Sequence, residues 1–342
     1  MKKVTLLLAI AILTLTGCNS YEQSEKLSSV ASKTLKGKAI EFKANITLPL
    51  ELFCTEDGIF IYEETPSGFI KFAPYSLESI SSFGDRGTDS KRFMTPKVEQ
   101  LNSKELIITS FNSHNVTISG NSKGEVNSKD LDFKNKELFF NIKYISHIEG
   151  DKYITSEKSE NQINIADDNA GNLECYTIFP FENKDSGLTK FDLVNTIFTS
   201  EMSYSNKNNT LFMAYTYYPY TTTIDMKDKK ILKKVEIKVG KEKENEYTIR
   251  GANDVLFLDA VLFYTQCVTT KNYNWALYHG CRMGEMVSNK SEIHQFSKSG
   301  ELLKRYILDR SIFNFGVTPN EENIYTINVN PSATYSFLKY DI

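Results

Sequence analysis

The chain has few residues in arrangements that catalysis requires. Its histidines are His114, His147, His279 and His294. None of them stands beside another histidine or at metal-ligand spacing from a carboxylate, and the sequence has no Gly-x-Ser-x-Gly, His-Glu-x-x-His or P-loop motif. We therefore expect structural roles for the histidines, and the sequence predicts no catalytic residue and no cofactor.

Oxygen ligands for a cation occur in two places. Asp167, Asp168 and Asn169 form one group, and Asp254 and Asp259 form another. The first group is typical of a hairpin turn, because Asp and Asn tolerate left-handed backbone conformations. Ca²⁺ takes about six to eight oxygen ligands, which would have to come from several parts of the chain. The sequence predicts no metal site, although the second group leaves a ligand role open.

The residue with the clearest chemistry is Cys18. It follows two lysines and an apolar run at residues 4–15, which is shorter than the roughly 20 residues of a transmembrane helix but has the length of a signal-peptide core. The run ends in Leu15-Thr16-Gly17-Cys18, which resembles the bacterial lipobox. Small residues let an extended backbone enter the signal peptidase, and the thiol carries a diacylglycerol thioether. This motif predicts a signal peptide at residues 1–17 and acylation of Cys18, with fatty acids such as palmitate.

A lipid anchor on Cys18 predicts a cell-envelope location. More than one acyl chain is needed for stable anchoring, and a lipoprotein carries more than one. The next residue is Asn19, not the Asp that retains some lipoproteins in the inner membrane, so we expect the outer membrane of a Gram-negative cell. Residues 18–36 are polar and Ser-rich, which predicts a flexible tether before a folded domain at residues 37–342.

The internal cysteines are Cys54, Cys175, Cys267 and Cys281. The expected compartment permits disulfides, but no Cys-x-x-Cys motif occurs. Cys267 and Cys281 are expected on adjacent antiparallel strands, where they could pair if the register matches. The alternative is two buried free thiols that pack as small hydrophobic groups.

A repeat that averages roughly 51 residues organises the folded part. Each copy is a turn followed by an apolar strand; the copies lie at 55–63, 102–111, 149–157, 206–218, 270–280 and 320–329. Within the first three copies, Ile59, Leu106 and Tyr153 are spaced by 47 residues. A second type of strand, which ends in a small turn, follows the first type in each of the first five copies. Repeats of this length with about four strands are typical of β-propeller blades.

Composition agrees with an all-β protein. Aromatic residues make up 12% of the chain, and strands favour aromatic and β-branched side chains. The six copies predict a six-bladed propeller of four-stranded antiparallel blades, but the last copy lacks a strand. Residues 37–48 could supply it and close the ring. The net charge of −3 gives no basic excess, so we expect no nucleic-acid partner.

Two further segments have alternative interpretations. Tyr215, Tyr217, Tyr218 and Tyr220 could form a stacking platform for a glycan or peptide, or they could pack between blades where Pro219 ends a strand. Residues 229–246 are rich in charge and could form a docking face. Alternatively, lysines on an outer strand simply prevent pairing between sheet edges.

The blade pattern resembles the TolB-like six-bladed β-propeller lipoproteins of Gram-negative bacteria. In residues 82–96, Gly84, Gly87, Phe93 and Pro96 match the family's glycine-rich turn followed by Phe and Pro, although the usual Gly-Pro-Gly stretch is missing. Residues 274–282 and 291–309 look like the family's late blades. The resemblance covers most of residues 37–342 and implies the fold, but it carries no catalytic residue into this chain.

Two functions compete at this point. The first is a monomeric, non-enzymatic binding module, held at the membrane by its lipid, whose propeller face binds a protein, peptide or glycan. The second is a Ca²⁺-dependent, lactonase-like hydrolase that uses the central funnel. A funnel lined by convergent carboxylates would favour the second, and the absence of a catalytic motif favours the first.

Overall fold

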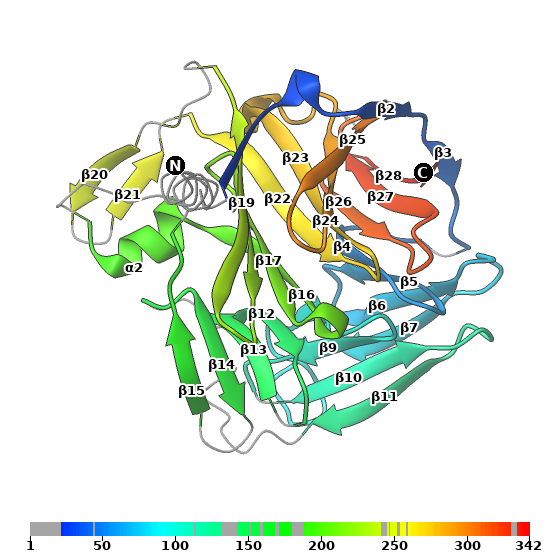
Figure 1. Ribbon diagram of the computed structural model, residues 1–342. Coiled ribbons are helices and arrows are strands. Elements are labelled where there is room, and N and C mark those ends of the chain that lie inside the picture. Colours follow the sequence, from blue (N-terminus) through cyan, green and yellow to red (C-terminus); the bar gives the residue numbers. More distant parts are fainter. Residues whose placement is uncertain are drawn as a thin grey trace, which may run out of the picture.

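The computed structural model describes residues 22–43, 45–112, 114–131, 142–150, 152–157, 160–167, 171–179, 188–240, 245, 247–251, 254–257, 259–329 and 334–342. These residues form six mostly four-stranded antiparallel sheets, which follow one another around a ring (Figure 1). The protein is a six-bladed β-propeller, and the predicted fold class is confirmed.

Each blade runs outward from the ring centre in chain order. Blade 1 contains β4 (Pro49–Cys54), β5 (Gly58–Glu63), β6 (Ser67–Pro74) and β7 (Ser81–Asp85). Blade 2 contains β8 (Lys97–Gln100), β9 (Glu105–Thr109), β10 (Asn115–Gly120) and β11 (Val126–Leu131). Blade 3 contains β12 (Ile142–His147), β13 (Lys152–Glu157), β14 (Ile163–Asp167) and β15 (Gly171–Tyr176).

The longest connections between blades lead into blades 4 and 5. Blade 4 contains β16 (Ser200–Ser205), β17 (Thr210–Tyr215), β18 (Tyr220–Asp225) and β19 (Lys230–Lys238). Blade 5 contains β22 (Val261–Thr269), β23 (Tyr273–Arg282), β24 (Glu292–Ser297) and β25 (Leu302–Leu308). Blade 6 contains β26 (Asn314–Val317), β27 (Asn323–Val329) and β28 (Tyr335–Asp341). A short helical segment, α2 (Lys190–Asp192) with a π-helical turn at Leu193–Ile197, precedes blade 4, and a hairpin of β20 (Tyr247–Gly251) and β21 (Asp254–Phe257) precedes blade 5.

Burial along the blades explains the sequence repeat. The repeated apolar segments are the second strands, and β5 and β17 are buried at every position. Both faces of these strands pack against neighbouring blades, so they are apolar throughout. By contrast, β11 lies at the outer end of its sheet and is exposed at most positions. The repeated segments therefore mark the most buried layer of the blades, with a spacing of 47 residues in the first three.

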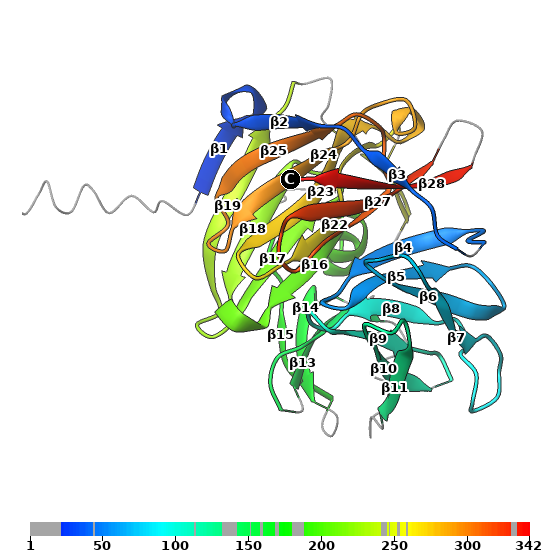
Figure 2. The ribbon, with the colours of Figure 1, turned by 90° about the vertical axis from the view of Figure 1, so that its right-hand side faces the viewer.

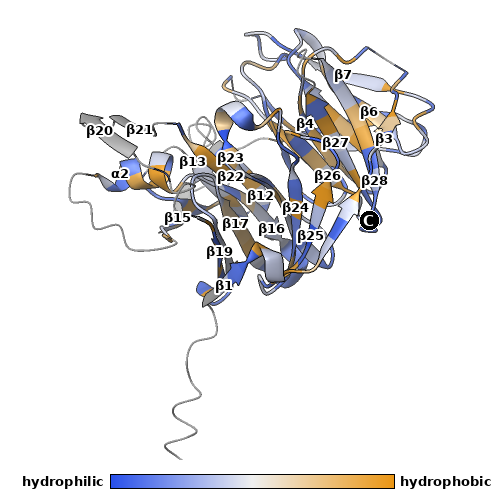
Figure 3. Ribbon diagram, turned by 90° about the horizontal axis from the view of Figure 1, so that it is seen from above, coloured by the Kyte–Doolittle hydropathy of each residue, from blue (hydrophilic) through white to orange (hydrophobic). Residues whose placement is uncertain are grey.

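The cores lie between blades. The rings of Phe212 in blade 4 and Phe296 in blade 5, for example, have centroids 5.0 Å apart. Figure 3 shows apolar residues gathered in inner strands such as β22, β23 and β26, whereas the outer strand β1 (Glu22–Lys26) is hydrophilic. Each blade thus depends on its neighbours for burial of its apolar faces.

The glycine-rich segment after β6 has one position with a strict steric demand. Gly84 has a φ of +83°, and a Cβ there would lie 2.6 Å from the ring of Phe69. Only glycine fits both constraints. The nearby Phe93 is buried and packs edge-on against Phe69, with ring centroids 5.3 Å apart.

The ring closes through the N-terminal part of the domain. The strand β3 (Lys38–Ile40) is the fourth strand of blade 6 and pairs antiparallel with β28. Its register places Ile40 opposite Phe337 and Lys38 opposite Lys339. The prediction that residues 37–48 complete the last blade is confirmed.

Residues 22–40 form an N-terminal strap across the outer edges of three blades (Figure 2). Before β3, the strand β1 pairs parallel with β19, and β2 (Ser32–Leu35) pairs parallel with β25. The predicted flexible tether is therefore wrong for residues 22–36, whereas residues 18–21 lie outside the described part. Exposed edge strands carry polar side chains, which gave this segment the composition of a linker.

The strap is held by specific contacts. The guanidinium of Arg305 donates a hydrogen bond of 2.6 Å to the carbonyl of Leu27 and two of 2.8 Å to the carboxylate of Glu292. Leu35 is buried in the core between blades 5 and 6. In the described part of the chain, no helix is long and apolar enough to cross a membrane.

Candidate functional site

The first strands of the blades surround a cavity of about 1050 Å³ at the ring centre. Lining residues come from β4, β8, β12, β16, β22 and β26, so every blade contributes. This volume is at the upper end of the roughly 300–1000 Å³ that small-molecule sites occupy. The ring centre is therefore large enough for a small organic ligand.

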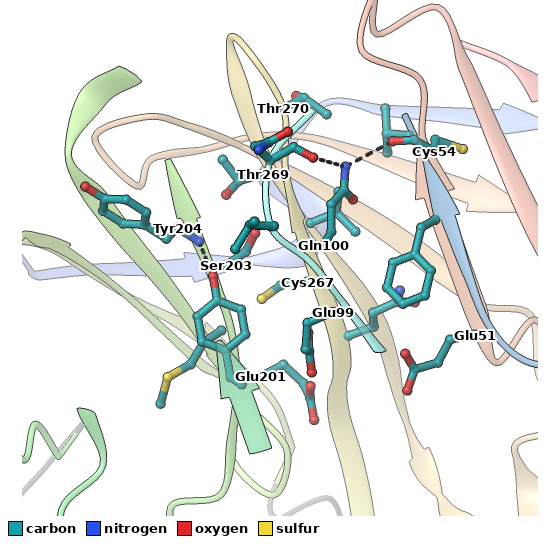
Figure 4. Close-up of a pocket in the computed structure, with 18 of the residues that line it drawn as sticks. Glu51, Cys54, Glu99, Gln100, Glu201, Ser203, Tyr204, Cys267, Thr269 and Thr270 are labelled. Carbon is teal, nitrogen blue, oxygen red and sulfur yellow. Dashed lines mark hydrogen bonds between the residues drawn. The ribbon is translucent and has the colours of Figure 1, made fainter. Parts of the chain in front are cut away.

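Three glutamates from three blades meet in this cavity. Glu51 lies on β4, Glu99 on β8 and Glu201 on β16. Figure 4 shows the carboxylates of Glu99 and Glu201 pointing toward one another, with the carboxylate of Glu51 on the same side of the cavity. All three lie in the half of the channel where the inner strands begin.

The surroundings disfavour the charged form of these glutamates. Burial, followed by the negative charge of Glu201, raises the pKa of Glu51 to about 7. Burial also raises the pKa of Glu201 to about 7, and it holds the pKa of Glu99 well above its usual range with help from the other two carboxylates. Like charges in a poorly solvated site resist ionisation together. The cluster thus carries only part of its formal charge near neutral pH.

Two lysines partly balance the carboxylates. Lys97 lowers the pKa of Glu51 and Glu99, and Lys143 lowers the pKa of Glu201. Lys97 and Glu99 are two residues apart on one strand, so their side chains lie on the same face. Lys143 also donates a hydrogen bond of 3.3 Å to Asn195. These cations leave the desolvation of the three carboxylates only partly offset.

The rest of the labelled lining is largely neutral. The Gln100 side chain donates hydrogen bonds to the carbonyls of Cys54 at 3.1 Å and Asn102 at 3.2 Å. Burial raises the pKa of the Cys267 thiol well above its usual range, so the thiol stays protonated and is a poor nucleophile. The other labelled residues therefore carry amide, hydroxyl and thiol groups (Figure 4), although Glu56, Lys207 and Lys271 also line the cavity.

The cluster is better suited to an organic cation than to a bare metal ion. Among the described residues, no group of three or more His, Cys, Asp or Glu side chains is arranged to hold a metal ion. An amine or guanidinium is larger, donates several hydrogen bonds and can contact carboxylates that are too far apart for one metal. Its positive charge would also favour ionisation of the glutamates.

The predicted tyrosine cluster is partly a packing feature. Tyr215 is fully buried, and its hydroxyl donates a 3.0 Å hydrogen bond to the carbonyl of Ile178. Tyr217, Tyr218 and Tyr220 are partly exposed in and beside the turn between β17 and β18. A glycan or peptide platform stays a prediction, in which these three tyrosines supply the accessible surface.

The predicted disulfide does not fit the register. Cys267 and Cys281 lie on adjacent antiparallel strands, as expected, but Cys281 is opposite Leu262 and Cys267 is opposite Ala276. A disulfide needs Cα atoms within about 7 Å. Among the described residues, Cys54, Cys175, Cys267 and Cys281 form no disulfide bond.

The buried histidines have structural surroundings. His279 contacts the hydroxyl of Thr265 at 2.9 Å, and burial lowers the pKa of His279 to about 4. His294 is fully buried against the ring of Tyr278, with centroids 4.5 Å apart. The other two histidines, His114 and His147, are partly exposed.

Asp167 and Asp259, two of the residues considered as cation ligands, do not line the cavity. Asp259 is exposed and pairs with Arg282 at 2.7 Å. Asp167 ends β14, whereas Asp168 and Asn169 lie outside the described residues. The side chain of Asp254 and the predicted acylation site Cys18 also lie outside them.

The three glutamates were missed by the sequence analysis. Glu51 and Glu99 are spaced by 48 residues, close to the blade repeat, so an alignment of the first strands would have found them. Glu201 does not follow the spacing, because the segment at 177–199 lengthens the connection into blade 4.

A closed ring of six blades defines the chain as a β-propeller, and its polar central cavity is large enough for a small ligand. Residues 24–320 match the family model described as "TolB-like 6-blade propeller-like". The chain belongs to this TolB-like family, as the sequence resemblance predicted. No curated protein matches the sequence.

One solved structure supports the fold. A DUF4221 family member from Bacteroides vulgatus is similar at a TM-score of 0.53 and 13% identity, with 90% of this chain and 97% of that chain covered. The β-propeller domain of Myceliophthora thermophila Cps50 (Swd1) is 8% identical, with a TM-score of 0.43 and coverage of 90% and 99%. Identities this low show the fold alone.

Proposed function

We propose that this protein is a lipoprotein of the bacterial cell envelope that binds a small, positively charged organic ligand in its central channel. The observation that carries this proposal is the convergence of Glu51, Glu99 and Glu201 in a cavity of about 1050 Å³. The binding is non-enzymatic, and acylated Cys18 holds the propeller at a membrane, the outer membrane in a Gram-negative cell.

The energetics of the glutamates support a cationic ligand. Carboxylates with pKa values near 7 are costly to ionise together in the empty channel. A bound ammonium or guanidinium offsets this repulsion. It donates charge-assisted hydrogen bonds, which the oxygens of the three carboxylates accept. The ligand therefore binds the ionised form of the site, and binding releases protons near neutral pH.

The hydrolase alternative has weaker support. Convergent carboxylates in the funnel are what it requires, but the described residues offer no arrangement of three or more metal-ligating side chains. Added Ca²⁺ should accordingly leave the melting temperature unchanged and produce no ester or lactone turnover. Calcium-dependent turnover that disappears in Glu99→Gln would replace the binding proposal with this alternative.

Thermal-shift measurements test the binding proposal. Spermidine, arginine and a basic dipeptide serve as cationic probes, and citrate serves as an anionic control. A ligand that binds only the folded state raises the melting temperature in proportion to RT ln(1 + [L]/Kd). We expect such a rise with at least one cation, stronger at pH 8 than at pH 6, and none with citrate.

Isosteric variants locate the effect. Glu99→Gln combined with Glu201→Gln should remove the response to the cation, whereas Glu301→Gln, on an exposed turn away from the channel, should keep it. An equal response in both variants, or no response to any cation, would overturn the proposed ligand class. Mass spectrometry of the mature N-terminus tests the lipid separately.

A further inference from the structure

The outer edge of blade 4 differs in charge from the rest of the molecule. The strap (residues 22–40) and the segment at 226–240, which contains β19, together form a basic edge with ten lysines and four acidic residues. The whole chain has a net charge of −3, so the remainder is clearly acidic. Positive charge is thus concentrated where the strap lies on blade 4.

Most of these lysines reach solvent. Lys26 and Lys238 are register partners on β1 and β19, and both are exposed. Lys33 and Lys36, farther along the strap, are also exposed, as is Lys230 at the start of β19. The side chains therefore continue along the edge from blade 4 onto blade 5.

Protection of a bare sheet edge does not explain the lysines of β19. Edge lysines normally prevent another strand from pairing. In this protein, β1 already pairs with β19 from Glu22 opposite Lys234 to Lys26 opposite Lys238. Edge protection therefore does not account for Lys234 and Lys238, which lie in the part of β19 that β1 covers, and the docking interpretation of this charged segment gains support.

The strap also places this edge next to the predicted anchor. Cys18 precedes Glu22, the first residue of β1, by four residues. Four residues span at most about 14 Å, even when fully extended. An acylated Cys18 therefore keeps the start of β1 and its neighbours on β19 within that distance of the lipid headgroups.

We propose that the basic edge docks on the anionic headgroups of the leaflet that holds the anchor, an inference that rests on the acylation of Cys18 in the proposed function. The lipid provides attachment, and the lysines fix which side of the propeller faces the membrane. Anionic lipid surfaces attract clustered lysines within about one Debye length. The orientation is therefore sensitive to salt, whereas the attachment is not.

Amine acylation of the full-length lipoprotein in vesicles tests the orientation. The protein is reconstituted into vesicles with phosphatidylglycerol or into vesicles of phosphatidylcholine alone, labelled with an acetyl N-hydroxysuccinimide ester, and digested for mass spectrometry. With phosphatidylglycerol at low salt, labelling of Lys26, Lys33 and Lys238 should slow at least about threefold, and high salt should reverse the effect because it shortens the screening length. The exposed Lys104 and Lys123, both in turns of blade 2, should label equally in both vesicles.

A matched pair of variants separates docking from crowding near the anchor. Lys26→Gln with Lys238→Gln should restore fast labelling of Lys33, whereas Lys104→Gln with Lys123→Gln should leave its protection intact. Equal labelling of Lys33 in both vesicle types would overturn the docking proposal.

The same samples distinguish docking from anchoring. If the N-terminus is acylated and the protein floats with both vesicles, equal labelling rates of the edge lysines in the two vesicle types overturn the docking proposal alone. If it is unacylated and floats with neither vesicle, both proposals fail. Salt-sensitive flotation of unacylated protein with phosphatidylglycerol vesicles would overturn the anchor and support the basic edge.

Discussion

The innermost and outermost strands of the propeller use charge in opposite ways. The inner strands bring Glu51, Glu99 and Glu201 into a cavity where ionisation is unfavourable. The outer edge of blade 4 presents lysines to water, where a charge has little energetic consequence. The buried carboxylates of the channel reduce stability, whereas the exposed lysines of the edge hardly affect it. A destabilising charged group is therefore a stronger indication of a functional site than an exposed one.

Removal of β3, the strand that closes the ring, should have the largest effect on the free energy of unfolding. Deletion of residues 37–48 exposes β28 and removes Ile40 and Phe42 from the core between blades 6 and 1. We expect a loss on the order of 5 kcal/mol, comparable to the total stability of many domains. Urea unfolding followed by the fluorescence of Trp275, the only tryptophan, measures it.

The matched control for this deletion is Lys38→Ala, which keeps the β3 backbone and removes only an exposed ion pair with Asp341. It should change stability by less than about 0.5 kcal/mol. An unchanged urea midpoint for the deletion would mean that the ring stays closed without β3.

Arg305→Lys tests the contact between the strap and blade 5. The substitution keeps the charge but loses the paired hydrogen bonds to Glu292 and weakens the contact with Leu27. We expect a loss of about 2–3 kcal/mol in urea unfolding. Lys304→Ala, beside it on β25, is the control; it removes only a contact of 4.8 Å with the Tyr306 ring and should have a smaller effect.

The pH dependence of this contact has a defined sign. The hydrogen bonds of His294 and Arg305 outweigh burial and lower the pKa of Glu292 to about 2. A carboxylate with a lowered pKa stabilises the fold above its ordinary value, and this stabilisation is lost as the pH falls from about 4.5 toward 2. The difference in the free energy of unfolding between wild type and Glu292→Gln, measured by urea unfolding, should therefore shrink as the pH falls through that range.

Substitution in the channel should stabilise the empty protein. Glu201→Gln removes a carboxylate whose pKa is about 7, and we expect a gain of about 1–2 kcal/mol at pH 8. Because the raised pKa makes the wild type lose stability as the pH rises from about 4.5 through 7, the gain should vanish near pH 5. Scanning calorimetry at both pH values measures this, and a destabilised variant at pH 8 would assign Glu201 a structural role instead.

Substitution of lysines on the outer edge should have the smallest effect on stability. Lys26→Gln with Lys238→Gln should change the free energy of unfolding by less than about 0.5 kcal/mol, because both side chains are exposed. A loss of more than about 1 kcal/mol in urea unfolding would show that these lysines hold the strap in place, and it would weaken the contrast with the channel.

The repeat predicted the fold because it marks the buried layer of every blade. Ile59, Leu106 and Tyr153 all lie on second strands, where packing on both faces demands apolar residues. The inner strands follow a weaker pattern, since one side faces the channel. Glu51 and Glu99 keep the repeat spacing, but the approach of Glu201 depends on the closed ring and is not visible in local sequence.

One expectation failed and one open alternative was excluded, both for reasons that a sequence does not display. Irregularities between Leu262 and Gln266 shift the pairing of β22 with β23, and the register separates Cys267 from Cys281. The strap looked like a linker because its strands lie at sheet edges and bury few residues. Register and edge pairing are properties of the assembled sheets.

The pairing of β3 with β28 also has a consequence for biogenesis. The two partners are far apart in the sequence, so β3 is synthesised well before the strand with which it pairs. Until β28 has been made and has folded, the last blade has an uncovered edge, which is vulnerable to aggregation and proteolysis. Folding should consequently depend on chaperones that shield the incomplete ring, and it should finish only after both strands have been synthesised.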